Sequence, residues 1–333
     1  MGGFWSYVVE PGFFESQTVQ VALLVGGVVA AISGVVGVFA VLRGQSFAGH
    51  AFGDISAAGG AGAFLLNISP LFGFLGMSLV AAGCMEAIGV RRVRGRDVAT
   101  GVVLGAGLGT SALFLYFNTT LHSTSGAAIS VLFGSLFAIS TSTVPAVVAS
   151  ATGALAVVLL LYRPLLLSSV GDDIAASRGV AVRVTGAVFL LAMAATVALA
   201  AITIGAILST ALLVGPAATA LRMTRRPSTA AVTAAAIGAA ATWLGCLLAY
   251  DSYYWPPVDH GWPVSFCIVA VIVISYLGVE AARSHRLRNA SGRAGSENRT
   301  TAVAPRAVAA SHGGHDAHGG HDALDALDAS RTD

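Results

Sequence analysis

The chain contains no lysine, so all 18 of its Lys and Arg residues are arginine. Without lysine it has neither the glycine-rich phosphate-binding loop that ends in Lys nor a lysine that forms a Schiff base. Any ATP hydrolysis that drives this protein must therefore come from a partner. The hydrolase motifs HExxH and GxSxG are also missing from the sequence, so we expect no enzymatic activity of its own.

Charge of either sign is scarce. Only 10% of the residues are charged, against about 25% in a typical soluble domain. Hydrophobic residues make up 56%, and the mean hydropathy is +0.80, which together indicate an integral membrane protein. Cysteine is rare as well: Cys84, Cys246 and Cys267 lie in apolar runs without a CxxC pair. We expect all three to be small buried side chains.

Long apolar runs dominate the rest of the chain, and about 20 such residues are enough for one membrane crossing. We expect an all-α polytopic protein with about eight or nine transmembrane helices. The expected spans are residues 18–42, 46–66, 71–90, 98–117, 143–162, two spans within 184–221 that meet near 202–205, 228–250 and 264–282. The apolar stretch 128–139 follows a polar loop, 118–126. It is too short to cross and indicates a re-entrant or surface helix.

Arginine-rich segments between the spans predict the orientation. They all fall on one side of the expected alternation: Arg43, 91–96, 163–183, 222–226 and 283–299. The positive-inside rule makes that side cytoplasmic. The N-terminus is then outside and the C-terminus is in the cytoplasm.

Composition divides the chain into three expected parts. Residues 1–17 form an extracytoplasmic lead, 18–283 a transmembrane domain, and 284–333 a polar cytoplasmic tail that we expect to be disordered. Within the tail, four histidines recur at intervals of three residues. Neutral imidazoles on such a chain can chelate Zn²⁺, Ni²⁺ or Cu²⁺. These candidate ligands are His312, His315, His318 and His321.

One polar motif, GHAFGD, interrupts the second expected span. It places His50 and Asp54 four residues apart, which puts both side chains on the same face of a helix. An ionisable side chain at membrane depth is costly and is a functional hypothesis by default. Imidazole and carboxylate together suit Zn²⁺ or Mn²⁺. A purely structural hydrogen bond between the two residues, or a proton relay, remains an alternative.

Other ionisable residues are weaker candidates. Asp259 and His260 lie in an expected outer loop and could add ligands, although a solvated loop is the simpler interpretation. Asp251 is expected to be an exposed polar end of its span, and His122 a surface residue. Glu86 lies about five residues before Arg91, so we expect it to snorkel or to pair with the 91–96 basic loop rather than to bind a metal.

Several sequence blocks occur in a fixed order along the chain. They are EPGFF with GVFAVLR (10–14 and 37–43), DVATGVV (97–103), LFGSLFAIS (132–140), the segment 168–182 and ALLVGPAATA (211–220). Together they resemble the permease subunits of the ABC importers for manganese, zinc and iron, and the resemblance covers most of the chain, from about Glu10 to Arg283. In this family the second helix carries G-D-x-L-x-H, whose Asp and His are implicated in metal binding. Here His50 stands at the Asp position and Asp54 at the His position.

The resemblance implies a function and partners. The chain would be the transmembrane subunit of an importer for a divalent transition metal, zinc before manganese, with no permanently bound cofactor. It would form a homodimer with cytoplasmic ATPases and an extracytoplasmic metal-binding protein. The segment 168–182 resembles the cytoplasmic coupling helix that meets the ATPase, with Asp172, Asp173, Arg178 and Gly179 in place. The alternatives are an ABC permease for iron–siderophore or cobalamin, and a secondary transporter or channel that uses His50 and Asp54 as a proton relay.

Overall fold

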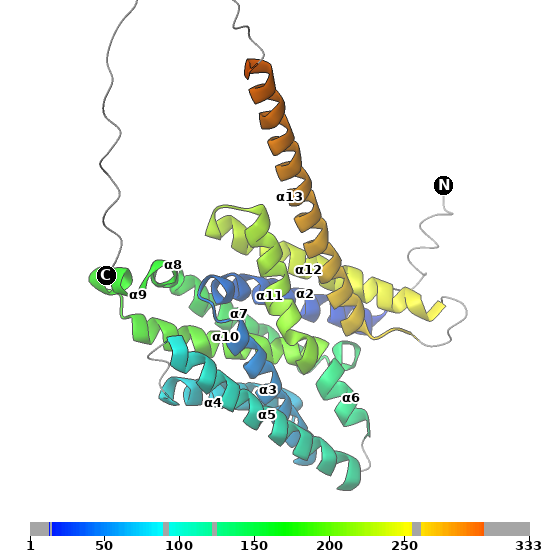
Figure 1. Cartoon of the computed structure of the whole chain (residues 1–333). Helices are drawn as coiled ribbons and strands as arrows, with labels where there is room; N and C mark the ends of the chain where they lie inside the picture. The colour runs from blue at the N-terminus through cyan, green and yellow to red at the C-terminus, as the bar shows by residue number, and fades with distance from the viewer. Residues whose placement is uncertain (1–12, 14, 89–92, 122–124, 255–260, 303–333) are drawn as a thin grey trace, which may run out of the picture. The chain divides into compact units, whose positions relative to one another are not determined.

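Every regular element that the structure describes is helical (Figure 1). The structure is a computed structural model and describes residues 13, 15–88, 93–121, 125–254 and 261–302. Its helices are α2 (Gln17–Leu42), α3 (Ser46–Leu65), α4 (Pro70–Ile88), α5 (Val93–Leu121), α6 (Ser125–Phe133), α7 (Val144–Leu160), α8 (Tyr162–Val170), α9 (Asp172–Ser177), α10 (Val182–Ile204), α11 (Ala206–Met223), α12 (Pro227–Asp251) and α13 (Val264–Ala302), with the 3-10 turns η1 (Leu136–Ala138) and η2 (Ser252–Tyr254). The predicted all-α class is confirmed.

Among the described residues, seven helices are long and apolar enough to cross a membrane. These are α2, α4, α5, α10, α11, α12 and α13. Helices α7 and α8 meet the same requirement as a pair bent by 59°, which makes up to eight spans. The bend separates the fifth expected span from the polar segment that follows it. The multi-span architecture predicted from the sequence is therefore confirmed.

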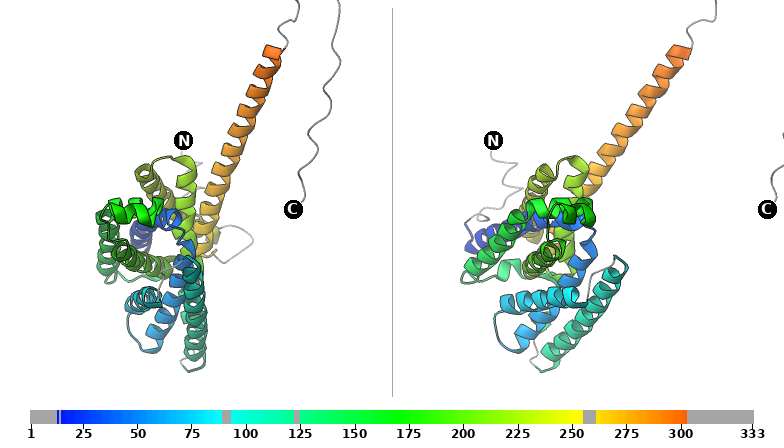
Figure 2. Two further views of the ribbon diagram at one scale, coloured as in Figure 1. Left: turned by 60° about the vertical axis from the view of Figure 1, so that its left-hand side comes forward. Right: turned by 90° about the vertical axis from the view of Figure 1, so that its left-hand side faces the viewer.

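Helix α3 corresponds to the expected span 46–66, which completes our count of nine spans. It is less apolar than the others because glycine, alanine, His50 and Asp54 take the place of large apolar residues. It is nevertheless 20 residues long, and most of its side chains are buried. It packs against α4, α5, α10 and α11. The blue and cyan helices α3, α4 and α5 lie side by side in all three views (Figures 1 and 2). Small side chains let neighbouring helices approach closely, so composition explains this central position.

The long apolar region 184–221 divides into α10 and α11 at Gly205, as the sequence predicted. The backbone of Gly205 has φ +93° and ψ 154°, a conformation that side-chain-bearing residues rarely adopt. A Cβ atom at this position would also lie 2.2 Å from the carbonyl oxygen of Leu132. Glycine therefore allows both the break between the helices and the close contact with the end of α6.

Two expected boundaries need correction. Residues 118–121 were expected in a polar loop, but they form the last turn of α5. Their side chains bond to the helix itself: Asn118 Nδ2 donates to the carbonyl oxygen of Phe114 at 2.9 Å, and the Thr119 hydroxyl donates to that of Leu115 at 2.9 Å. Polar residues that bond back in this way do not end a helix. The expected short helix, 128–139, is found as α6, which begins at Ser125 and already ends at Phe133, and the separate 3-10 turn η1 follows at Leu136–Ala138.

The last helix also continues past the expected end of the transmembrane domain. Contacts within the chain separate two units, Met1–Arg283 and Ser284–Asp333, and the helical conformation extends through residues 284–302 of the second unit. We expected disorder there. The stretch has four arginines and three alanines and no proline before Pro305, but it also has three serines, two glycines, two asparagines and two threonines, so composition alone does not predict this helix. The division into lead, transmembrane domain and tail otherwise stays a prediction.

Candidate metal-binding site

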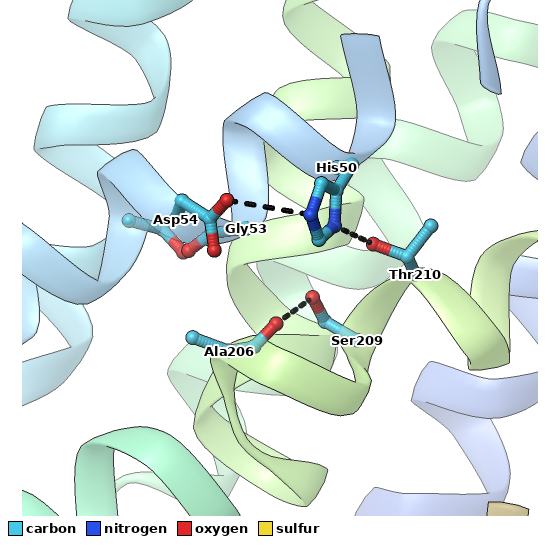
Figure 3. Close-up of polar contacts among 7 residues, drawn as sticks. His50, Gly53, Asp54, Ala206, Ser209 and Thr210 are labelled. Carbon is cyan, nitrogen blue, oxygen red and sulfur yellow. Dashed lines mark hydrogen bonds and ion pairs between the residues drawn. The ribbon is translucent and has the colours of Figure 1, made fainter. Parts of the chain in front are cut away.

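Helix α3 brings His50 and Asp54 together on one face, as their spacing predicted (Figure 3). The Nε2 atom of His50 lies 3.6 Å from Oδ2 of Asp54. The Asp54 side chain is 8% exposed, whereas the His50 side chain is 43% exposed. The imidazole is therefore partly exposed, whereas the carboxylate is buried within the bundle.

A second helix, α11, holds the imidazole from the other side. The Nδ1 atom of His50 lies 3.1 Å from Oγ1 of Thr210 (Figure 3). A neutral imidazole has one donor and one acceptor nitrogen, and a hydroxyl can serve either of them. Thr210 can therefore orient the ring in both tautomers while Nε2 stays directed toward Asp54. Thr210 was not among the predicted site residues, although it is a hydroxyl residue in an apolar helix and directly precedes the 211–220 block.

Gly53 allows α3 and α11 to cross at this point. A Cβ atom on Gly53 would lie 2.7 Å from the Ser209 hydroxyl oxygen and 3.2 Å from the Ala206 carbonyl oxygen. The Ser209 hydroxyl donates to the Ala206 carbonyl at 2.8 Å, so it is held within α11 (Figure 3). A larger residue at 53 would push the two helices apart and move Thr210 away from His50.

Asp54 is not fully satisfied by its neighbours. Its Oδ2 atom is buried and has no hydrogen-bond partner among the described residues, and 3.6 Å is longer than a normal hydrogen bond. A buried charged group without full pairing is costly. This carboxylate and the imidazole provide one oxygen and one nitrogen donor, which is chemistry suited to a divalent transition metal. In the part of the chain that the structure describes, no three His, Cys, Asp or Glu side chains form a metal-binding group.

The remaining candidates have different outcomes. Asp259, His260, His122 and the tail histidines at 312, 315, 318 and 321 lie outside the described residues. Asp251 was expected to be exposed but is 8% exposed, because α12 includes it in its last turn, and η2 follows directly. Glu86 pairs with an arginine outside the expected 91–96 loop, since Arg183 Nε lies 3.3 Å from its Oε1 atom.

Cysteine burial is only partly as expected. Cys246 and Cys267 are buried, whereas Cys84 is exposed on α4. Because α4 is one of the candidate membrane spans, an exposed apolar side chain on it is compatible with contact to lipid. In the sequence, a position that faces lipid and a position in the core both lie in a hydrophobic run, so the two cannot be distinguished there.

The expected coupling segment forms a separate surface. Asp172 and Asp173 are exposed in the first turn of α9. Arg178 caps the end of this six-residue helix, and Gly179 follows with φ +80°. The two acidic and the basic side chains thus lie on one short helical segment, available for charged groups of another protein.

Comparisons with known proteins agree with this architecture. A model of the ABC 3 transport family matches residues 15–279. The chain is 27% identical to the manganese import system permease protein ScaB of Streptococcus pneumoniae over 80% of this chain and 91% of that protein. It is 26% identical to the high-affinity zinc uptake system membrane protein ZnuB of Buchnera aphidicola over 76% of this chain and 95% of that protein.

A solved structure has a similar fold. PsaBC from Streptococcus pneumoniae in complex with Fab matches with a TM-score of 0.66 and 24% identity, over 80% of this chain and 92% of the matched chain. At this identity the likeness concerns the helical arrangement alone.

Proposed function

The chain belongs to the ABC 3 transport family, and on that premise we propose that it carries a divalent transition metal ion through the cytoplasmic membrane as the membrane-spanning subunit of an ABC importer. It is a multi-pass membrane protein and a transport subunit. The matched residues include every candidate span except the end of α13. Relatives named for manganese and for zinc support both metals as cargo.

The observation that carries this proposal is the pair His50–Asp54 on α3, where that helix packs against α11. An imidazole nitrogen lies 3.6 Å from a buried carboxylate oxygen, and this oxygen, Asp54 Oδ2, has no hydrogen-bond partner among the described residues. A metal ion bound there would supply the missing positive partner. The exposure of His50 supports a site that is reached from outside the subunit. Transport also requires that the metal leave, so a site with few ligands and moderate affinity is suitable.

Two ligands are too few for a complete coordination shell of Zn²⁺ or Mn²⁺. We propose that a second copy of the chain supplies a second His50–Asp54 pair in a homodimer. The 43% exposure of the imidazole supports this arrangement, because that part of the ring is available to a metal shared with a partner. Asp259 and His260 remain proposed ligands of an outer site, and the tail histidines at 312, 315, 318 and 321 a proposed metal buffer in the cytoplasm.

ATP hydrolysis must come from a separate cytoplasmic subunit, since the chain has no lysine for a phosphate-binding loop. We propose that this ATPase binds the coupling segment 168–182. Exposed Asp172 and Asp173 at the start of α9 support the proposal, because they can pair with basic residues on the partner. A metal-binding protein outside the membrane would deliver the cargo. The arginine distribution supports an outside N-terminus and a cytoplasmic C-terminus.

Uptake of radioactive zinc and of radioactive manganese tests the proposal. The chain is co-expressed with its ATPase, and wild type is compared with His50→Ala and Asp54→Ala. We expect both variants to lose uptake of the transported metal by more than about tenfold, since even residues that only support metal ligands typically contribute about 10–100-fold. Leu191→Ala, a change at an exposed apolar position on α10, serves as the control.

Two outcomes would contradict the proposal. Uptake at the wild-type rate in both variants would exclude the His50–Asp54 site. Uptake that continues when the ATPase subunit carries an inactivating substitution would instead favour a secondary transporter, in which the same pair acts as a proton relay.

A further inference from the structure

We propose that Arg43 is a positioning residue that connects the coupling segment to the helix that carries His50 and Asp54. The inference rests on the proposed function, because it assigns a route by which ATPase binding at 168–182 reaches the metal site. Arg43 caps the C-terminal end of α2. In the sequence, Arg43 is one of the basic residues that predict orientation and the last residue of the GVFAVLR block.

The first contact of Arg43 is with the coupling segment. Its Nη1 atom donates a hydrogen bond to the hydroxyl oxygen of Ser168, 125 residues away in the sequence. Ser168 is buried in α8, and its own hydroxyl proton is directed to the Leu165 carbonyl at 3.1 Å. The hydroxyl oxygen is therefore placed as an acceptor for the guanidinium group. Only Gly171 separates the end of α8 from Asp172 at the start of α9.

The second contact is with α10. The guanidinium carbon of Arg43 lies 5.8 Å from the centre of the Phe189 ring, within the range of a cation–π interaction. Phe39, one turn earlier in α2, packs edge-on against both Phe189 and Tyr162, with ring centres 6.5 and 5.6 Å apart. The charged group thus sits where α2, α8 and α10 meet, above an aromatic cluster that holds the three helices together.

The third connection runs along the chain to the metal site. Gly44 and Gln45 alone separate Arg43 from α3. The Gln45 amide donates to the Ala40 carbonyl at 2.8 Å, and the Gln45 carbonyl accepts from the Gly49 amide at 3.2 Å. This hydrogen-bonded turn joins the end of α2 to the residue that precedes His50. A shift of α8 that pulls on Arg43 would therefore be passed to the start of α3.

If Arg43 makes this connection, its substitution should uncouple metal transport from ATP hydrolysis without preventing assembly with the ATPase. The complex of this chain with its ATPase is reconstituted in lipid vesicles, and three quantities are measured: co-purification of the ATPase, ATP hydrolysis, and metal uptake. Because coupling between two sites typically amounts to about 5–150-fold, we expect Arg43→Gln to reduce metal ions moved per ATP by roughly tenfold. Co-purification and ATP hydrolysis should stay at the wild-type level. Arg43→Lys, which keeps a charged donor, should recover part of the loss.

Ser168→Ala removes the acceptor from the other side of the contact and deletes only a hydroxyl group. We expect it to lower the same ratio, and the double variant Arg43→Gln/Ser168→Ala to be no worse than the poorer single variant, because both remove one interaction. Arg163→Gln, an exposed arginine on α8, is the matched control for Arg43. Ser78→Ala is the control for Ser168, since the Ser78 hydroxyl likewise donates to a carbonyl three residues earlier.

The outcomes separate this inference from the proposed function. If the wild-type complex shows no ATP-dependent metal transport, the proposed function is wrong, and so is the inference that rests on it. If wild type transports but Ser168→Ala keeps the normal ratio of metal to ATP, Arg43 has no coupling role. The inference is also wrong if the losses of the two single variants simply multiply in the double variant. It is likewise wrong if the Arg43→Gln complex loses uptake only in proportion to its loss of ATPase binding.

Discussion

Two kinds of contact between acidic and basic side chains occur in this protein, and they differ in distance and burial. Arg222 Nη1 lies 2.8 Å from Glu280 Oε2, with both side chains substantially exposed. His50 Nε2 lies 3.6 Å from Asp54 Oδ2, and the aspartate is almost fully buried. The shorter contact, Arg222–Glu280, therefore lies where water would screen it, and the longer contact, His50–Asp54, lies where a buried charge is costly.

This difference argues against stability as the reason for the buried pair. A carboxylate that stabilised the bundle would be expected to accept strong hydrogen bonds, because burial raises the cost of every unmade one. Asp54 leaves one oxygen without such a bond among the described residues. The Arg222–Glu280 pair, in contrast, joins the end of α11 to α13 and fits an ordinary surface ion pair. The comparison thus supports a functional role for His50–Asp54.

The largest expected effect that sharpens this comparison comes from Asp54→Asn, which keeps the shape of the side chain and removes its charge. Uptake should fall by more than roughly tenfold, because a metal ligand contributes at least as much as the groups that support it. Thermal stability of the purified protein in detergent should stay the same or rise, since a poorly paired buried charge is removed and such a group costs about 1–3 kcal/mol. Normal uptake with a lower melting temperature would instead identify a structural pair.

A smaller effect is expected from Thr210→Val, which replaces the hydroxyl beside His50 Nδ1 with a methyl group. The imidazole loses its orienting partner but remains present, so the apparent affinity for metal should fall by about tenfold, the lower part of the range for supporting residues. Metal uptake measured over a range of concentrations checks this. Thr210→Ser keeps the hydroxyl and serves as the control. Equal affinities of the Val and Ser variants would exclude an orienting role.

The smallest effect is expected from Glu280→Gln at the exposed pair. Pairs of this kind typically contribute about 0.2–1 kcal/mol, so the melting temperature should change little and uptake should remain normal. Arg222→Gln should behave in the same way, and the contribution should shrink further at high salt. A large loss of uptake in both variants would break the comparison, because it would assign the exposed pair a role in transport.

Much of the fold and part of the site could be predicted from the sequence. The apolar runs gave the limits of α2, α10, α11 and α12 to within a few residues, because membrane depth requires a minimum length of apolar helix. Polar residues near helix ends were less reliable. Composition favours a loop at Asn118 and Thr119, which continue α5, and an exposed end at Asp251, which is buried. The side chains of Asn118 and Thr119 bond to the backbone of their own helix, which composition does not reveal.

By itself, the sequence determined that this is a multi-span helical membrane protein and that His50 and Asp54 share a helix face. Both follow from local rules, the hydrophobicity of a run and the 3.6-residue period of a helix. Only the tertiary structure decided that Thr210 meets His50, that Arg183 rather than a neighbour in the chain pairs with Glu86, and that Arg43 reaches Ser168. Each of these contacts joins residues far apart in the sequence, so it depends on how helices cross and on how closely small residues such as Gly53 let them approach.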